Sequence, residues 1–217
     1  MAQQMIFEAA AAPPFMTNGF VLGCPRTKEG VLVDPGDCVD ELVATANRLG
    51  LRITRILLTH AHLDHVSGVA AAKRAFDVPV YLHKDDQFLY DSATEQGTMF
   101  GLRIEQPPPL DRHYGASGED LGFGDFSVDV HHTPGHCPGG VCLAIGPKGE
   151  TRRELFVGDT LFAQSIGRTD LPGGDYETLM RSIKEVLFAF PDDTPVHPGH
   201  GPSTTIGEEK RSNPFLT

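Results

Sequence analysis

The chain has 217 residues, of which 40% are hydrophobic and 22% are charged, as is ordinary for a soluble globular protein. This length can bury a substantial core in one large domain or two small ones. The net charge of −11 opposes phosphate backbones and anionic membrane surfaces, so neither nucleic acid nor a membrane is an expected partner. No apolar run approaches the length that crosses a bilayer.

The N-terminus and the cysteines indicate the compartment. Residues 1–14 have neither a basic region nor a long apolar core, so we expect no signal peptide. The four cysteines show no C-x-x-C spacing and no disulfide framework; they are Cys24, Cys38, Cys137 and Cys142. A reduced chain in the cytoplasm fits these features.

The first half of the chain predicts strands that alternate with helices. Apolar runs predict strands over residues 20–23, 30–34, 55–59 and 78–82. The second strand is followed by a turn at Asp34-Pro35-Gly36. Apolar residues at helical spacing predict a helix over 39–49, with Asp37 as its N-cap and Gly50 as its end. We expect a further helix over 66–74.

The remaining segments complete a two-sheet pattern. Residues 83–100 look partly helical, and residues 104–124, with three prolines in a row, predict a long irregular surface loop. Further strands are expected over 126–131, 141–145, 155–157 and 194–197. Before the last of these, Asp175 is the predicted N-cap of a long helix whose apolar face is Tyr176, Leu179, Met180, Ile183, Val186 and Leu187. Two strand-rich halves, each ending in helices, predict two packed sheets with helices outside.

The most informative motif is the run H-A-H-L-D-H, which places His60, His62, Asp64 and His65 in one tight turn. It lies between a predicted buried strand and a predicted helix, the position where α/β sheets place their sites. Three imidazoles and a carboxylate suit a borderline metal such as zinc or iron better than magnesium. The motif therefore predicts a metalloenzyme.

Three more candidate ligands follow downstream, each directly after a predicted strand. They are His136 in H-T-P-G-H, Asp159 in F-V-G-D and His200 in H-P-G-H-G. Seven ligand-type residues at strand ends are enough to bind two metal ions that share one bridging carboxylate.

These motifs, in this order, resemble the metallo-β-lactamase superfamily of hydrolases: T-H-A-H-L-D-H, H-T-P-G-H, F-V-G-D-T-L-F and P-G-H-G. With S-I-G-R-T-D at 165–170, the chain is similar to the glyoxalase II-like branch, the hydroxyacylglutathione hydrolases and their short relatives. The resemblance spans residues 17 to about 206. It implies one α/β domain over residues 1–217, a four-layer αββα sandwich of two mixed β-sheets with helices on the outer faces.

The resemblance also implies a role for each ligand. His60, His62 and His136 would hold the first metal, and Asp64, His65 and His200 the second, with Asp159 bridging both. No cysteine stands at a ligand position, unlike the β-lactamases that bind their second metal through a thiolate. This all-nitrogen and oxygen set is expected to bind two divalent ions, zinc in the first place, with iron and manganese also suited.

The resemblance implies that this binuclear centre hydrolyses a small-molecule thioester. Two cations about 3.5–4 Å apart would share a water whose pKa falls to about 7, and the resulting bridging hydroxide would attack the thioester carbonyl. Asp64 would both bind a metal and orient this hydroxide, which makes it the expected catalytic residue. S-lactoylglutathione or a related hydroxyacylglutathione is the expected substrate. Only residues 201–217 follow His200, so the helical C-terminal domain of the larger relatives is not expected, and the thioester could be a different one.

The other notable residues have simpler interpretations. We expect surface, packing or supporting roles for the remaining histidines, with His132 and His197 as candidates to orient ligands; the others are His83, His113 and His131. Gly68 and Gly135 are expected to allow close packing and a turn. Arg168 and Asp170 predict a buried ion pair that braces the metal loop, and Cys137 is expected only to pack.

Other functions share this ligand set. A persulfide dioxygenase also resembles the chain, including a G-R-T-D segment, and would bind one iron through His60, His136 and Asp159. The stretch 171–175 is closer to the short hydrolases, which favours hydrolysis. A nuclease of the same fold is disfavoured by the acidic charge. A β-lactamase or lactonase activity is testable by turnover. Oligomeric state is not predicted.

Overall fold

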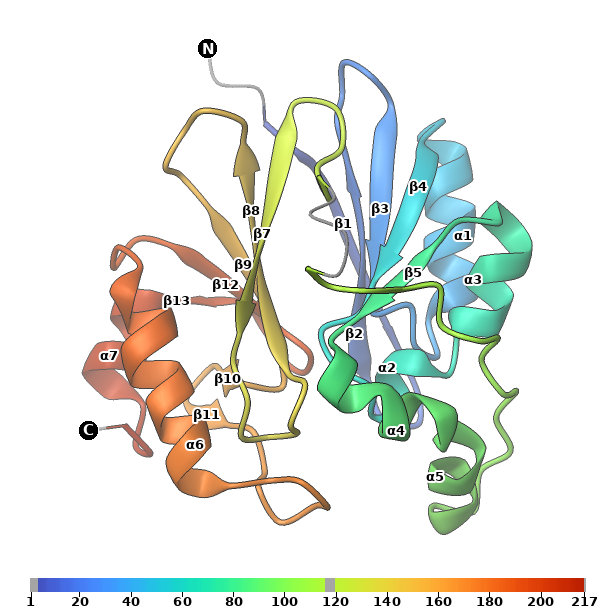
Figure 1. Cartoon of the computed structure of the whole chain (residues 1–217). Helices are drawn as coiled ribbons and strands as arrows, with labels where there is room; N and C mark the ends of the chain where they lie inside the picture. The colour runs from blue at the N-terminus through green and yellow to red at the C-terminus, as the bar shows by residue number, and fades with distance from the viewer. Residues whose placement is uncertain (1–3, 116–119, 217) are drawn as a thin grey trace.

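The computed structural model describes residues 4–115 and 120–216. Two β-sheets face each other, and helices cover the outer face of each (Figure 1), so the predicted four-layer αββα architecture is confirmed. The first sheet contains, in spatial order, β1 (Ile6–Ala12), β2 (Thr17–Gly23), β3 (Glu29–Val33), β4 (Arg52–Leu57), β5 (Val80–Leu82) and β6 (Arg112–His113). The second contains β13 (Thr204–Thr205), β12 (Pro195–Pro198), β9 (Glu154–Gly158), β8 (Val141–Pro147) and β7 (Phe126–His132).

Helices lie outside the sheets and along the edge that carries the site. Outside the first sheet lie α1 (Val39–Arg48) and α3 (Val69–Phe76), and outside the second lie α6 (Tyr176–Arg181) and α7 (Ile206–Ser212). Short elements follow the strand ends: α2 (Leu63–Val66), η1 (Lys84–Asp86), α4 (Gln87–Asp91), α5 (Ala93–Met99) and the small hairpin of β10 (Leu161–Phe162) and β11 (Ser165–Ile166). No helix within the described ranges is long and apolar enough to cross a membrane.

The alternation of side chains along the strands builds three hydrophobic layers. In β2, Phe20 and Leu22 point into the layer between the sheets, whereas Val21 points toward the helices outside the first sheet. In β9, Phe156 points between the sheets, whereas Leu155 packs toward α6. Both faces of these strands are buried, which explains why they appear in the sequence as continuous apolar runs.

Parallel pairing brings the predicted site residues to one edge. The strands β3, β4 and β5 are parallel neighbours, and β9 pairs in parallel with β12. The carboxyl ends of parallel strands meet at the same edge, so the loops after β4, β9 and β12 converge. This edge lies at the lower end of both sheets in Figure 1, near α2 and β10.

Several predicted element boundaries are wrong. Asp37 does not cap α1: the helix begins after Cys38, and Asp37 accepts a hydrogen bond from Ser67 Oγ at 2.8 Å. The helix expected over 66–74 is two helices, α2 and α3, interrupted near Gly68. The loop expected over 104–124 contains β6, and its residues 116–119 lie outside the described part.

The helix predicted after Asp175 is confirmed at its start and differs later. Asp175 Oδ1 accepts from the backbone N–H of Thr178 at 2.8 Å, as an N-cap does. After α6 the chain continues as a π-helical turn, η2 (Ser182–Val186), and a 3₁₀ turn, η3 (Leu187–Ala189). Leu179, Ile183 and Leu187 are buried in the outer layer as predicted, but Tyr176 is exposed. The strand β1 and the terminal α7 have no counterpart among the predicted elements.

Candidate metal centre

All seven predicted ligands converge at this edge. Their nitrogen and oxygen atoms form three overlapping groups, and within each group the atoms lie within 4.8 Å of one another. The groups are His60–His62–His136, His60–His65–Asp159 and Asp64–His65–His200. Because His60 and His65 each belong to two groups, the three groups form one continuous cluster that could hold more than one metal ion.

The first histidine group comes from two loops that face each other. His60 and His62 follow β4, and His136 lies in the loop between β7 and β8. All three side chains are buried. Nδ1 of His62 lies 2.8 Å from Nε2 of His136. At this distance one hydrogen bond joins the two ring nitrogens in the metal-free chain. A metal cation that displaced its proton could be bound by both nitrogens.

The second group combines the first turn of α2 with the loop after β12. Asp64 Oδ2 lies 3.1 Å from His200 Nε2 and 3.6 Å from His65 Nε2. The His65 side chain is fully buried, whereas that of His200 is 31% exposed. The group therefore has one side open to solvent, as a centre that receives a substrate requires.

Asp159 lies between the two groups. Its Oδ1 is 3.4 Å from His65 Nε2, and its Oδ2 is 3.6 Å from His136 Nε2 and 3.5 Å from His200 Nε2. The carboxylate is thus within reach of histidines from both groups, with Oδ2 between His136 and His200, and this is the position that a bridging ligand needs.

Three buried polar atoms at the centre have no hydrogen-bond partner within the described chain: His60 Nε2, His65 Nε2 and Asp159 Oδ1. A buried polar atom without a partner costs about 1–3 kcal/mol, so three together within one cluster need an external partner. Imidazole nitrogens and carboxylate oxygens are ligands for zinc, iron and manganese, so this donor set fits a divalent metal.

Asp34, which was predicted only as part of a turn, orients two of the histidines. Its Oδ2 lies 2.9 Å from His65 Nδ1 and accepts from Thr59 Oγ1 at 2.6 Å. Since the threonine hydroxyl donates to Asp34, it can accept from His60 Nδ1, which lies 3.2 Å away. Both rings then carry their proton on Nδ1, and both Nε2 atoms present a lone pair to the centre.

Other groups hold the remaining ligands. Thr17 Oγ1 donates to Asp64 Oδ2 at 2.6 Å, and the backbone oxygen of Arg168 accepts from His136 Nδ1 at 2.7 Å. Asn18 donates its backbone N–H to Gly199 and its side-chain amide to Pro198 and Gly201, which fixes the loop of His200 to β2. No signal in the sequence marks Thr17 and Asn18, because the predicted strand begins only at Phe20. Their supporting role becomes visible in the structure, where they form the start of β2.

The surroundings of the cluster shift the pKa values of its carboxylates and histidines. Burial raises the pKa of Asp64, but the neighbouring His65 and His200 outweigh it and lower that pKa to about 2. Burial lowers the pKa of His62 to about 3, with His136 adding to the effect. Burial opposes the protonation of His200, yet hydrogen bonds to Asp159 and Asp64 raise its pKa to about 9. Burial also opposes the protonation of His65, but Asp64 and Asp34 raise its pKa well above the ordinary value. The metal-free centre thus offers ionised carboxylates and a neutral His62, whereas His65 and His200 must release a proton before their Nε2 atoms can bind a metal.

Three glycines near the site allow close approaches that a side chain would block, and one of them, Gly199, lies against the proposed ligands. A Cβ on Gly199 would lie 2.2 Å from Asp159 Oδ1, and one on Gly68 would lie 2.1 Å from the backbone oxygen of Gly36. Gly135 has φ +128°, and its Cβ would meet the backbone of Leu179. The predicted roles of Gly68 and Gly135 in packing and turn formation are confirmed.

The predictions for residues around the site have mixed outcomes. His132 contacts the Pro138 oxygen and His197 contacts Ser203 and Glu154, so neither orients a ligand. The prediction of a buried Arg168–Asp170 pair is wrong: the pair forms, but the side chains are 56% and 67% exposed.

Cys137 packs as predicted, and it reveals another buried acid. Its side chain is fully buried, and Sγ donates to Asp86 Oδ2 at 3.1 Å. Asp86 also accepts from the backbone N–H groups of Ala61 and Gly139, and so ties the metal turn to the loop of His136. The sequence places Asp86 in a polar stretch with no pattern that marks this role.

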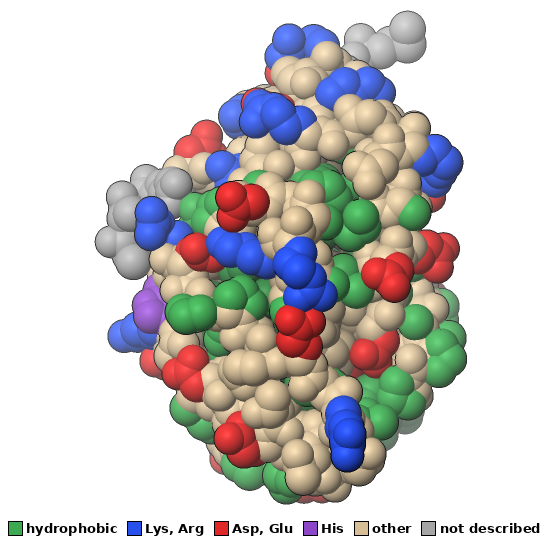
Figure 2. All heavy atoms as spheres, turned by 90° about the vertical axis from the view of Figure 1, so that its right-hand side faces the viewer, with side chains coloured by type: hydrophobic (Ala, Val, Ile, Leu, Met, Phe, Trp, Pro, Cys, Tyr) green, Lys and Arg blue, Asp and Glu red, His purple; other side chains and the backbone are tan. Residues whose placement is uncertain are grey.

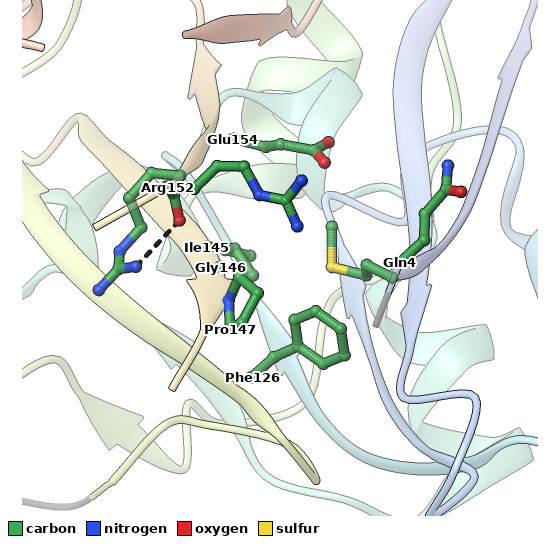
Figure 3. A pocket seen from close by; sticks show the side chains of 9 residues that line it. Gln4, Phe126, Ile145, Gly146, Pro147, Arg152 and Glu154 are labelled. Atoms are coloured by element: carbon green, nitrogen blue, oxygen red, sulfur yellow. Dashed lines mark hydrogen bonds between the residues drawn. The ribbon is translucent and has the colours of Figure 1, made fainter. Parts of the chain in front are cut away.

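Two adjoining cavities open beside the ligands. One of about 170 Å³ is lined by five of the ligands and by Phe15, Leu63, Gln96, Phe100, Arg168 and Leu171. The second, of about 210 Å³, shares His62, Gln96, Phe100 and Leu171 with it and extends along α4 and α5. A separate cavity of about 240 Å³ lies where β7 begins, near Phe126 and Glu154 (Figure 3), and none of the seven ligands lines it.

The family model of the metallo-beta-lactamase superfamily matches residues 12–205. The chain belongs to this superfamily, and its fold and His/Asp clusters are those of a metallo-hydrolase. Among curated relatives, it is 42% identical over 190 residues to the hydroxyacylglutathione hydrolase GloC of Haemophilus influenzae, covering 87% of this chain and 88% of that one. The predicted resemblance to the glyoxalase II-like branch is thereby confirmed.

Solved structures agree. The BLEG-1 B3 metallo-beta-lactamase aligns with a TM-score of 0.86 at 40% identity, covering 98% of this chain and 100% of that one. TTHA1623, solved in a di-iron-bound form, aligns with a TM-score of 0.83 at 41% identity, covering 96% and 100%. ETHE1 from Myxococcus xanthus aligns with a TM-score of 0.75 at 29% identity, covering 97% and 84%.

Proposed function

We propose that this chain is a binuclear metal-dependent hydrolase of thioesters, with S-lactoylglutathione or a related hydroxyacylglutathione as substrate. The observation that carries the proposal is the position of Asp159, with its carboxylate oxygens directed to His65 on one side and His136 on the other. Such a carboxylate fits two cations better than one. The similarity to the hydrolase GloC supports the reaction class.

The proposed ligand sets follow the geometry. His60, His62 and His136 would hold the first metal, Asp64, His65 and His200 the second, and Asp159 would bridge them. Zinc, iron and manganese all suit these donors, and zinc is our first proposal. Bound there, the two ions would supply a water of lowered pKa and Lewis-acid stabilisation of the negative charge that develops on the carbonyl oxygen.

The residues of the chain position the water and the substrate. Asp64 is ionised because its pKa is lowered to about 2 by His65 and His200 against the effect of burial, and Thr17 fixes its Oδ2. This carboxylate can therefore accept a hydrogen bond from the attacking water and orient its lone pair. In the reaction the water oxygen bonds to the acyl carbon, the C–S bond breaks, and a water proton ends on the leaving sulfur, giving a carboxylic acid and a thiol.

The compartment proposed is a reducing one such as the cytoplasm. All four cysteines are buried and unpaired, as expected of a chain that folds without disulfides. A glutathione thioester is a substrate of the same reducing environment.

The deciding experiment combines metal analysis of the purified protein with turnover of S-lactoylglutathione, followed as loss of thioester absorbance. We expect about two metal ions per chain, one for each of the proposed ligand sets. Turnover is expected to be abolished in Asp64→Ala and Asp159→Ala. The matched control is Asp192→Ala, because this exposed carboxylate pairs with Lys210 away from the cluster. One iron per chain, no thioester turnover and oxygen uptake with glutathione persulfide would instead establish the dioxygenase.

A further inference from the structure

We infer that the cavity along α4 and α5 is an acyl-chain subsite, so that among the thioesters this site hydrolyses, those whose acyl group carries a longer apolar chain than lactoyl are preferred. This inference rests on the proposed function and extends it to the substrate's acyl half. The lining is mostly apolar: it includes Phe88, Leu89, Met99, Phe100, Leu171 and Pro172.

The cavity begins at the metal centre. His62, a proposed ligand of the first metal, lines both this cavity and the one over the ligands, as do Phe100 and Leu171. If the thioester carbonyl carbon lies at the ligands, a group bonded to that carbon lies at the mouth of the apolar cavity. The acyl chain is such a group, and it can enter the cavity directly.

The charges beside the site favour the acyl half over the thiol half in this cavity. Among the described residues lining the apolar cavity, Glu95 is the one that carries a formal charge at neutral pH, and it would repel the carboxylates of a glutathione moiety. Arg168 lies over the ligands instead, in the neighbouring cavity, with an exposed guanidinium. The polar thiol half is better accommodated on that side and toward solvent.

The outer wall of the cavity carries large apolar side chains that are partly exposed to solvent. Met99 is 81% exposed, and Phe88 and Phe100 are 50% and 52% exposed. Exposed side chains of this size on neighbouring helices are a recognised sign of a ligand surface. Figure 2 looks onto the side of the molecule that carries α3 and α5, where hydrophobic side chains are interspersed with charged ones.

The test is the dependence of kcat/KM on acyl length in S-acetyl-, S-butanoyl- and S-hexanoylglutathione, with the metal-loaded protein. Each buried methylene is expected to raise kcat/KM by about fourfold, so the hexanoyl compound should exceed the acetyl compound on the order of a hundredfold. Phe88→Glu should reduce this ratio about tenfold by placing a charge in the wall. Phe215→Glu is the matched control, since Phe215 is also 50% exposed but does not line the cavity.

A second readout separates this inference from the proposed function. Calorimetric titration with hexanoate and acetate measures the subsite without turnover, and hexanoate should bind more tightly in the wild type and in Phe215→Glu but not in Phe88→Glu. Turnover of all three thioesters at equal efficiency would overturn the acyl subsite and leave the hydrolase standing. Preferential binding of hexanoate with no turnover of any thioester would support the apolar subsite and overturn the hydrolase. No turnover and no preference would overturn both.

Discussion

Asp34 Oδ2 lies 2.9 Å from Nδ1 of His65, and both side chains are buried. Asp34 follows β3 and His65 lies in α2, so the contact joins the end of one strand to the helix that begins after its parallel neighbour. The carboxylate holds the imidazole proton on Nδ1 and leaves Nε2 directed at Asp64 and Asp159. A proposed metal ligand is thus oriented by a residue that belongs to none of the three candidate ligand groups.

The first prediction is that Asp34→Asn weakens metal binding by about 10–100-fold, because the amide can no longer fix the ring as a carboxylate does. Competition with a metal chelator measures the affinity. The control is Asp40→Asn, an exposed acid in the first turn of α1. Unchanged affinity in Asp34→Asn, with the fold intact by circular dichroism, would show that His65 needs no such support.

Thr17→Val is predicted to lower kcat by about tenfold, since a hydrogen bond to a buried charged group contributes about 1.5–3 kcal/mol. The lost bond is the 2.6 Å contact of Thr17 Oγ1 with Asp64 Oδ2, which fixes the proposed catalytic carboxylate. KM for the thioester should change little, because Thr17 does not line the cavities beside the ligands. Steady-state kinetics of Thr17→Val and of the exposed control Thr98→Val separate the two parameters; an effect on KM alone would contradict this role.

Metal binding is predicted to tighten as the pH rises toward 9. Burial lowers the pKa of His200, but hydrogen bonds to Asp159 and Asp64 prevail and raise it to about 9 in the metal-free chain. At neutral pH this imidazole must release a proton to bind a metal, so affinity should rise about tenfold per pH unit for each proton released. Calorimetry in buffers of different ionisation enthalpy counts those protons.

The raised pKa of His200 also makes the stability of the metal-free protein depend on pH. A histidine whose pKa is raised on folding stabilises the fold fully below its unfolded pKa of about 6.5. That stabilisation is lost as the pH rises through about 9, the folded value for His200. Urea unfolding of wild type and His200→Gln at pH 6 and 10 should show a difference at the lower pH that shrinks at the higher one. A difference independent of pH would rule out this contribution.

The sequence predicted which residues gather at the site better than it predicted the groups that hold them, for a physical reason. The candidate ligands from His60 to His65 occupy one short segment, and local spacing is visible in a sequence. Asp34 and Asp86 act across distances of 31 and 51 residues, on His65 and Cys137, and nothing near them marks that role. The parallel neighbours β3 and β4 bring Asp34 to the site, and this pairing emerges only from the fold.

Contacts between residues far apart in the sequence also explain why some predicted elements are wrong. Asp37 is of a residue type that often caps helices, but its carboxylate accepts a hydrogen bond from Ser67, in the segment after α2, instead of from the start of α1. The strand β1 carries a run of alanines with no strand preference of its own, and its full pairing with β2 from Ile6 to Ala12 determines its structure. Where the local sequence pattern is weak or fits more than one structure, tertiary contacts determine which structure forms.

The last prediction concerns Gly199, which lies directly against the carboxylate of Asp159, the proposed bridging ligand. A Cβ at this position would lie 2.2 Å from Asp159 Oδ1 and 2.7 Å from His65 Cε1, so Gly199→Ala must displace one of them. We expect the variant to bind less than the full metal complement and to lose thioester turnover. Gly201→Ala is the informative comparison, because Gly201 has φ +76° and a Cβ there would meet nothing within 4 Å. It should lose about 1–2 kcal/mol of unfolding free energy through backbone strain and keep its metals. Metal analysis and urea unfolding of both variants make the test. Equal metal content in the two would mean that the approach of Gly199 to Asp159 is not needed for the centre.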